Sequence, residues 1–313
     1  MKRADHHRTK GATVVFFSVV LLTIFWLPDF FGFGLVPTSN GYRLLAIGLA
    51  IVNGLVLYGL GERFLSYNRS GHLMLWFYLL VVFAYPQART FSFAFLSALL
   101  AEAGLFTLFI AAEGKGRLAP LFLAGLFTTC AGLLYWPGFI MVLVVAAGAL
   151  VLRIFSLRRG LIFLGGVMLP FGGVLFYRFW VFEDIWVFGE IFSKMIGHTQ
   201  PGPAPDTPAA LFLMGVLVYL LLRSLLRIIN ISDGANALRS RALATIVIML
   251  LFCSATAFLY AREIYGFLPL LALPVSACLS CYFSVDKTNP RLSAELYVLL
   301  LALLVNQLAN LLR

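Results

Sequence analysis

Carboxylates and arginines that border long apolar stretches are the side chains best suited to chemistry in this sequence. Asp29 lies at the end of the first such stretch, Arg178, Glu183 and Asp184 close a later one, and Arg262 precedes another. A carboxylate at a membrane surface can deprotonate a hydroxyl or hold a divalent cation, and an arginine can bind a phosphate through two hydrogen bonds. We therefore take the three carboxylates as candidate catalytic residues and the two arginines as candidate ligands of a lipid phosphate.

Polar residues inside apolar stretches form a second group, because a charge in lipid costs about 2.5–3.5 kcal/mol or more. Glu102 lies mid-stretch among alanines and glycines, which let another helix approach closely. It is either a proton or cation site or a carboxyl that joins two helices. Glu295, Asn306 and Asn310 share one face of a helix at their spacings, and we expect that face to point into the protein.

Motifs for other chemistries are missing from the sequence. No spacing of His, Cys and carboxylates predicts a metal site, and no nucleotide-binding loop or nucleophile elbow occurs. Cys278 and Cys281 form a Cys-x-x-Cys without a second cysteine pair, so we expect no redox role. We expect no cofactor, except a divalent cation if the reaction is a group transfer.

The composition predicts that a lipid bilayer surrounds these residues. Of 313 residues, 62% are apolar and 12% are charged, whereas soluble domains carry about 45–50% and about 25%. A spanning helix needs about 20 apolar residues. Eleven apolar stretches fall at 12–31, 42–61, 72–86, 91–112, 119–134, 138–152, 161–180, 208–226, 242–260, 264–284 and 293–312.

The positions of the basic residues predict the topology. With a cytoplasmic N-terminus and eleven crossings, 17 of the 23 Lys and Arg residues fall on the cytoplasmic side, as the positive-inside rule requires. The same rule explains the net charge of +10 without nucleic acid as a partner. We therefore expect one all-helical transmembrane domain over 1–313, with a cytoplasmic tail at 1–11, a longest periplasmic loop at 181–207 and a periplasmic C-terminus.

Turn residues and small residues predict how several helices pack. The Pro-Gly within 135–138 favours a tight hairpin over one long kinked helix across 119–152. Ala46, Ala50 and Gly54 repeat every four positions and predict a close-packing stripe. Glycines and Pro170 within 161–180 predict a helix that kinks or unwinds.

Two resemblances add expectations about function. The first helix, the acidic Asp29 and the late segment "AREIYGFLPLLALP" resemble the polyprenyl-phosphate-sugar glycosyltransferases of the GT-C superfamily. That resemblance implies that Asp29 is a base or metal ligand, and that Arg262 contacts the donor phosphate. The segment "PVSACLSCYFSVDKTNPRLSAELYVLLLALLVNQ" and the region from 121 to 171 look like a bacterial family of uncharacterised multi-pass inner-membrane proteins, which implies topology and setting but no site.

These observations leave three functions open. The leading hypothesis is a step in lipid-linked glycan or glycolipid metabolism of the bacterial cell envelope, with membrane lipids and a polyprenyl-phosphate-linked sugar as partners. The second is a transporter or flippase that uses Glu102 and the polar face of the last helix. The third is a non-catalytic scaffold subunit, in which polar groups only join helices.

Overall fold

The computed structural model describes residues 40–65, 71–85, 91–114, 117–182, 207–232, 237–259, 264–284 and 290–311. Within these ranges the chain forms ten α-helices, one π-helical turn and one 3-10 turn, and no strand. The expected all-helical class is therefore confirmed for this part of the chain. The stretch predicted at 12–31 lies outside the described residues.

The ten α-helices correspond one to one with the second to eleventh apolar stretches. They are α2 (Asn40–Leu60), α3 (Gly71–Phe83), α4 (Phe93–Glu113), α5 (Ala119–Leu134), α6 (Ile140–Val151), α7 (Leu157–Phe182), α9 (Pro208–Ser232), α10 (Ala237–Leu259), α11 (Ile264–Ser284) and α12 (Pro290–Leu311). The π-helical turn Gly61–Leu65 continues α2, and the 3-10 turn Trp136–Phe139 separates α5 from α6.

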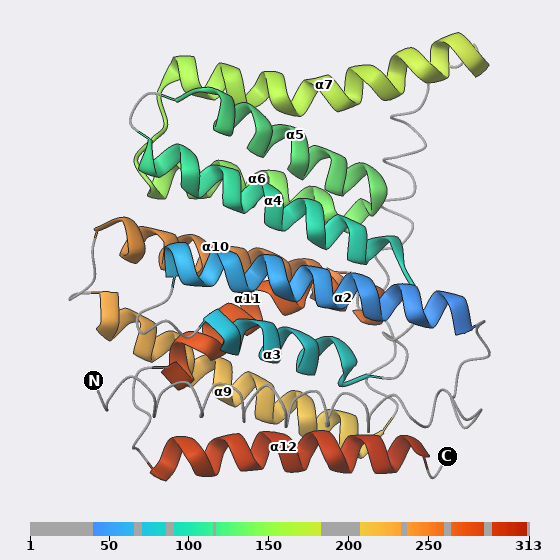
Figure 1. Ribbon diagram of the computed structural model, residues 1–313, viewed down its shortest axis with the longest axis vertical. Helices are drawn as coiled ribbons and strands as arrows, with labels where there is room; N and C mark the ends of the chain where they lie inside the picture. Colours follow the sequence, from blue (N-terminus) through green and yellow to red (C-terminus); the bar gives the residue numbers. More distant parts are fainter. Residues whose placement is uncertain are drawn as a thin grey trace, which may run out of the picture.

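Consecutive helices run in opposite directions, so the bundle has two ends (Figure 1). The helices stack along the long axis of the molecule, with α7 and α12 at its two extremes and α2, α4, α10 and α11 between them (Figure 1). In the most apolar window of α11, 83% of the residues are buried, against 11% for α7. Hence α11 is a central helix and α7 a peripheral one.

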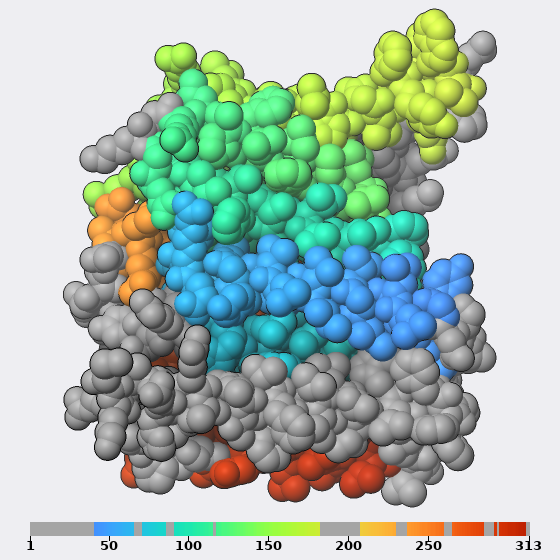
Figure 2. All heavy atoms as spheres, in the orientation of Figure 1, coloured from blue at the N-terminus to red at the C-terminus, as the bar shows by residue number. Residues whose placement is uncertain are grey.

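Six of these helices are long and apolar enough to cross a bilayer. They cover Gly41–Leu65, Phe93–Glu113, Leu157–Val181, Pro208–Ile229, Ala237–Leu259 and Tyr265–Ser284. Large apolar side chains also cover much of their outer surface, including Leu161, Phe176 and Trp180 on α7, where lipid takes the place of a protein neighbour. The last turns of α7 project beyond the other coloured helices (Figure 2). The chain is a membrane protein.

Arginines distinguish one end of the bundle, which we call the arginine-rich end. It is the end where α2, α4, α6, α9 and α11 finish and α3, α5, α7, α10 and α12 begin (Figure 1). Ten of the twelve described arginines lie toward it: Arg63, Arg117, Arg153, Arg158, Arg159, Arg223, Arg227, Arg239, Arg241 and Arg291. Of the arginines that the structure describes, only Arg43 and Arg178 lie toward the opposite end.

Contacting aromatic rings occur toward both ends of the bundle, and we call the opposite end, which has the Tyr and Trp contacts described below, the aromatic end. The start of α2 stacks on the residues before α4, with Tyr42 and Phe91 ring centroids 6.3 Å apart. The end of α3 meets the start of α11, with Tyr85 and Tyr265 ring centroids 5.5 Å apart. The 3-10 turn between α5 and α6 adds Trp136, which packs edge-on against the ring of Phe139. Tyr and Trp favour the interface between lipid and water.

The hairpin predicted near 135–138 is present. α5 ends at Leu134, the Gly138 amide donates to the Tyr135 carbonyl over 2.7 Å, and α6 returns antiparallel (Figure 1). A Cβ at Gly138 would lie 2.9 Å from the Ala131 carbonyl oxygen and 2.5 Å from Ser97 Oγ, so only glycine fits this turn without a shift.

The sequence predicted that α7 kinks or unwinds at its glycines and Pro170. The helix does not unwind, because it is continuous from Leu157 to Phe182, and it bends along its length in Figure 1. Gly166 serves close packing instead. A Cβ at Gly166 would lie 2.1 Å from the Phe122 carbonyl oxygen of α5, and one at Gly125 would lie 2.5 Å from the Phe163 carbonyl oxygen of α7. The two backbones therefore touch where these glycines meet.

The small-residue stripe predicted on the second apolar stretch is confirmed. Ala46 and Ala50 are fully buried, and a Cβ at Gly54 would lie 2.4 Å from Cδ1 of Leu75 on α3. The small residues around Glu102 also permit close approach, since a Cβ at Gly104 would lie 2.6 Å from Cγ2 of Thr128 on α5. Small side chains thus set the spacing of the helices that surround the interior polar groups.

Candidate functional site

Four of the candidate site residues, Asp29, Glu183, Asp184 and Arg262, lie outside the described residues. Arg178 lies on α7 four residues before its end, half-buried and toward the aromatic end. Among the residues that the structure describes, no group of three or more His, Cys, Asp or Glu is placed to hold a metal ion. Of the residues expected to form the transfer site, Arg178 is therefore the one that the structure describes.

A first group of contacts forms the junction of α3, α11 and α12 at the aromatic end. Asn306 on α12 donates to the Ala84 carbonyl over 2.8 Å, and Gln307 donates to the Phe83 and Ala84 carbonyls over 3.3 and 3.0 Å. These carbonyls end α3, where the helix itself provides no donor. The two amides of α12 thus cap α3 directly before Tyr85, whose ring contacts Tyr265 on α11.

This junction fixes the start of α11, which is the segment that follows Arg262 in the sequence. Tyr265 is three residues after Arg262, and Phe267 and Leu270 in the next turns are fully buried. The segments that carry Asp29, Glu183 and Asp184 also join described helices at this end, because they precede α2 or follow α7. In the sequence, Glu183 and Asp184 follow α7 directly, and Asp29 stands eleven residues before α2.

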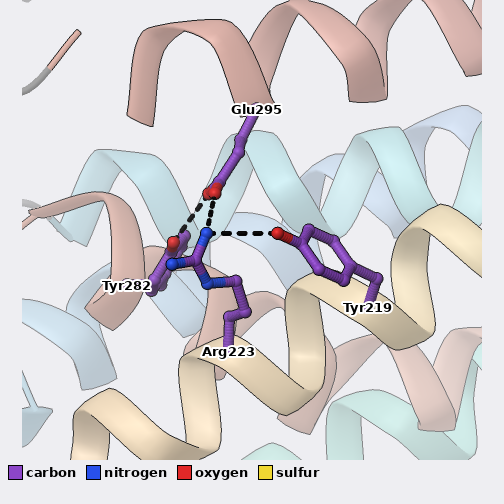
Figure 3. A network of polar contacts seen from close by, with 4 residues as sticks. All are labelled: Tyr219, Arg223, Tyr282 and Glu295. Atoms are coloured by element: carbon purple, nitrogen blue, oxygen red, sulfur yellow. Dashed lines mark hydrogen bonds and ion pairs between the residues drawn. The ribbon is translucent and has the colours of Figure 1, made fainter. Parts of the chain in front are cut away.

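A second group of polar contacts joins α9, α11 and α12 toward the arginine-rich end (Figure 3). The Glu295 carboxylate accepts hydrogen bonds from Nη1 of Arg223 and from the hydroxyl of Tyr282, the latter over 2.6 Å. Arg223 also donates to the Tyr219 hydroxyl over 3.1 Å, one turn earlier on α9. The Arg227 guanidinium lies 5.5 Å from the centre of the Tyr282 ring.

The exposed fractions of its side chains indicate how much this network contributes to the stability of the fold. The Arg223 side chain is 43% exposed and that of Glu295 is 14% exposed, so the pair lies at the surface of the bundle on the arginine side. Ion pairs of this kind typically contribute about 0–1 kcal/mol. Glu295 therefore acts as a joint between three helices, and its carboxylate is already committed to two donors.

The remaining predicted residues of the last helix are also engaged in packing. Leu299, Ala302, Leu303 and Asn306 are buried on one face of α12, as the spacing predicted. Asn310 donates to the carbonyl of Asn306 over 2.8 Å, within the same helix. The polar face of α12 thus anchors helices, because its side-chain donors are bonded to carbonyls.

A third group of polar residues lies in the interior between α2, α3 and α4. The Asn53 amide donates to the Tyr78 hydroxyl over 3.0 Å and to the Phe95 carbonyl over 3.1 Å. Glu102 is fully buried on α4, and neither of its carboxyl oxygens has a hydrogen-bond partner among the described residues. Asn53 therefore joins the helices here, and Glu102 joins none of the described ones by a hydrogen bond.

Sequence reasoning did not single out Tyr78, Arg223, Tyr282 or Gln307 as site residues. One signal was available for Arg223, because an arginine within the apolar stretch 208–226 requires a partner of opposite charge. Glu295, a carboxylate within the stretch 293–312, could have been proposed as that partner. For Tyr78 and Tyr282 no signal existed, because tyrosine is common in apolar helices. Gln307 neighbours Asn306 and shares its role at α3, which only the packing of α12 reveals.

Comparison with known proteins places the chain in a family. The sequence model of a family described as "Family of unknown function (DUF6427)" matches residues 11–312, nearly the whole chain. The chain belongs to this family. No curated protein matches it.

Proposed function

We propose that this member of the DUF6427 family transfers a group from a polyprenyl-phosphate-linked donor at the aromatic end of its bundle. The membrane is the bacterial inner membrane, and the aromatic end faces the periplasm. The observation that carries the proposal is the junction of Tyr85 with Tyr265, which fixes the start of α11 beside Arg262 in the sequence. The resemblance of that segment to GT-C glycosyltransferases supplies the reaction class.

The distribution of charge supports the orientation. Cytoplasmic loops of inner-membrane proteins are enriched in Lys and Arg, and ten of the twelve described arginines lie toward one end. That end is therefore cytoplasmic in the proposal. Polyprenyl-linked donors are used at the other face, where the aromatic end places rings that favour the headgroup layer.

The proposed chemistry requires a base and a phosphate ligand. The Asp29 carboxylate takes the proton of the acceptor hydroxyl while the acceptor oxygen forms a bond to the donor sugar carbon. The bond between that carbon and the phosphate oxygen breaks, and the polyprenyl phosphate leaves with the electron pair. Arg262 stabilises the phosphate charge, with Arg178 as a second cation and Glu183 and Asp184 as further carboxylates for a base or a divalent cation.

The test is the lipid content of a strain that lacks the gene. Mass spectrometry of its extracted lipids should show a polyprenyl-phosphate-linked sugar that accumulates at least several-fold over the parent strain. The wild-type gene should restore the parent level, and Asp29→Asn and Arg262→Ala should not. Arg63→Ala is the matched control, because Arg63 is an exposed arginine at the opposite end that pairs with Glu113 over 2.7 Å.

Immunoblots must show equal amounts of all three variants in the membrane. If the deletion strain accumulates no such lipid, or if Asp29→Asn and Arg262→Ala both restore the parent level, the protein is not this transferase. If the protein is a transporter, Glu102→Gln should instead fail to complement the deletion. If it is a scaffold, Asp29→Asn, Arg262→Ala and Glu102→Gln should all complement it.

A further inference from the structure

Glu102 is a buried carboxyl that the proposed transfer reaction does not use. It lies near the middle of α4, and its exposed fraction is 0%. Along the same face of α4, Phe95, Ala98 and Leu105 are also fully or almost fully buried. Neither Glu102 oxygen accepts a hydrogen bond from any described residue. An ionised carboxylate in this position would be both desolvated and unpaired, which proteins avoid by keeping such a group neutral.

The helices around Glu102 provide no cation at its level. The described residues of α5, α6 and α11 include no Lys, Arg, Asp or Glu. The helices α2 and α10 and the π-helical turn carry theirs only near their ends, at Arg43, Glu62, Arg63, Arg239 and Arg241. On α3, His72 lies in the first turn, and Tyr78 is the titratable group that interacts electrostatically with Glu102. No described ion pair therefore compensates the charge of Glu102.

Two uncommitted polar atoms belong to the same interior. Asn53 uses its amide nitrogen for Tyr78 and Phe95, and its Oδ1 has no donor among the described residues. Tyr78 accepts from Asn53, and its own hydroxyl hydrogen goes to no described acceptor. Among the described residues, the Glu102 oxygens and Asn53 Oδ1 thus lack a donor, and the Tyr78 hydroxyl hydrogen lacks an acceptor.

We propose that Glu102, together with Tyr78 and Asn53, is an internal proton-binding site. In the proton-bound state the Glu102 carboxyl is neutral and gains an O–H donor, which the open acceptors of this interior require. In the proton-free state the Tyr78 hydroxyl is the donor available to stabilise the carboxylate. Binding and release of a proton at this depth is the property that proton-coupled movement across a membrane needs. The inference is independent of the proposed transfer reaction.

Infrared spectroscopy of the purified full-length protein in lipid vesicles tests this site. At neutral pH the wild-type protein should show the carbonyl stretching band of a neutral carboxylic acid, and Glu102→Gln should lose it. Glu295→Gln is the matched control, because Glu295 accepts from Arg223 and Tyr282 and should contribute no such band. Tyr78→Phe should keep the band and shift its frequency, since it removes the hydroxyl that interacts with the carboxyl.

Two results would overturn the proposal. The first is a wild-type spectrum in which no neutral-acid band depends on Glu102. The second is a wild-type protein that sodium chloride stabilises and choline chloride does not, with no such difference in Glu102→Gln. That result would assign a sodium ion to the site. Thermal unfolding of each variant establishes that it is folded. If Glu102→Gln does not fold, the frequency shift of the band in Tyr78→Phe tests the site in its place.

Discussion

The Asn53 amide on α2 donates to the Tyr78 hydroxyl on α3 over 3.0 Å, and both residues are fully buried. The same amide donates to the Phe95 carbonyl on α4. One side chain therefore connects three helices of the bundle interior. Hydrogen bonds between membrane helices are modest in energy, so their main effect here is to fix which helix faces meet.

A double-mutant cycle on Asn53 and Tyr78 measures this connection. We expect Asn53→Ala and Tyr78→Phe to show a coupling energy of about 0.6 kcal/mol, and at most about 1.7 kcal/mol, the range for hydrogen bonds between membrane helices. Reversible unfolding of the purified protein in mixed micelles gives the four free energies. Additive effects of the two substitutions would show that the hydrogen bond does not contribute to stability.

The crossing of α5 and α7 predicts that alanine substitutions at two glycines of α7 have different effects on stability. Gly166→Ala places a methyl group 2.1 Å from the Phe122 carbonyl oxygen, and overpacking of this kind costs about 1–3 kcal/mol. Gly172→Ala meets no atom within 4 Å and removes a glycine from a helix, so it should be neutral or stabilise by up to about 1 kcal/mol. Thermal unfolding compares the two variants directly. Equal effects would contradict the close approach of the backbones.

The amide caps on α3 predict that α12 controls the start of α11. Asn306→Leu combined with Gln307→Leu removes the donors to Phe83 and Ala84, at about 0.5–1.5 kcal/mol for each hydrogen bond. Hydrogen exchange should accelerate at the end of α3 and in the first turn of α11, while the first turns of α12 stay protected. Val298→Leu, on the exposed face of α12, is the control. Unchanged hydrogen exchange at Tyr265 would show that the amides of α12 do not control the start of α11.

Hydrophobic length and periodicity predicted the positions of the described helices, because a bilayer requires about 20 apolar residues for each crossing. The ends were less predictable. α10 begins at Ala237 instead of 242 and α9 continues to Ser232 instead of 226, since a helix that has formed continues into water through its own hydrogen bonds. α3 ends at Phe83, three residues before Pro86, which is a local stop signal. That side chains of α12 bond its last carbonyls is not reported by any local pattern.

Local patterns gave the inward face of α12 but not its partners. The spacing of Glu295 and Asn306 predicted a shared face, yet the residues they bind are Arg223 and Ala84, far away in the sequence. Which helix meets which face depends on side-chain packing across the whole bundle. For the same reason Glu102 was found from sequence, whereas its complete burial without a hydrogen-bond partner among the described residues required the structure.

The orientation of α7 tests the account most directly, because the transfer site is assigned to the aromatic end. Leu157 and Trp180 are 82% and 75% exposed and lie near opposite ends of this one helix. In a cysteine-free background, a membrane-impermeant maleimide added to intact spheroplasts should label Trp180→Cys, and should label Leu157→Cys only after lysis. Labelling of Leu157→Cys in intact spheroplasts, with Trp180→Cys protected until lysis, would place the aromatic end in the cytoplasm and contradict the proposed reaction site.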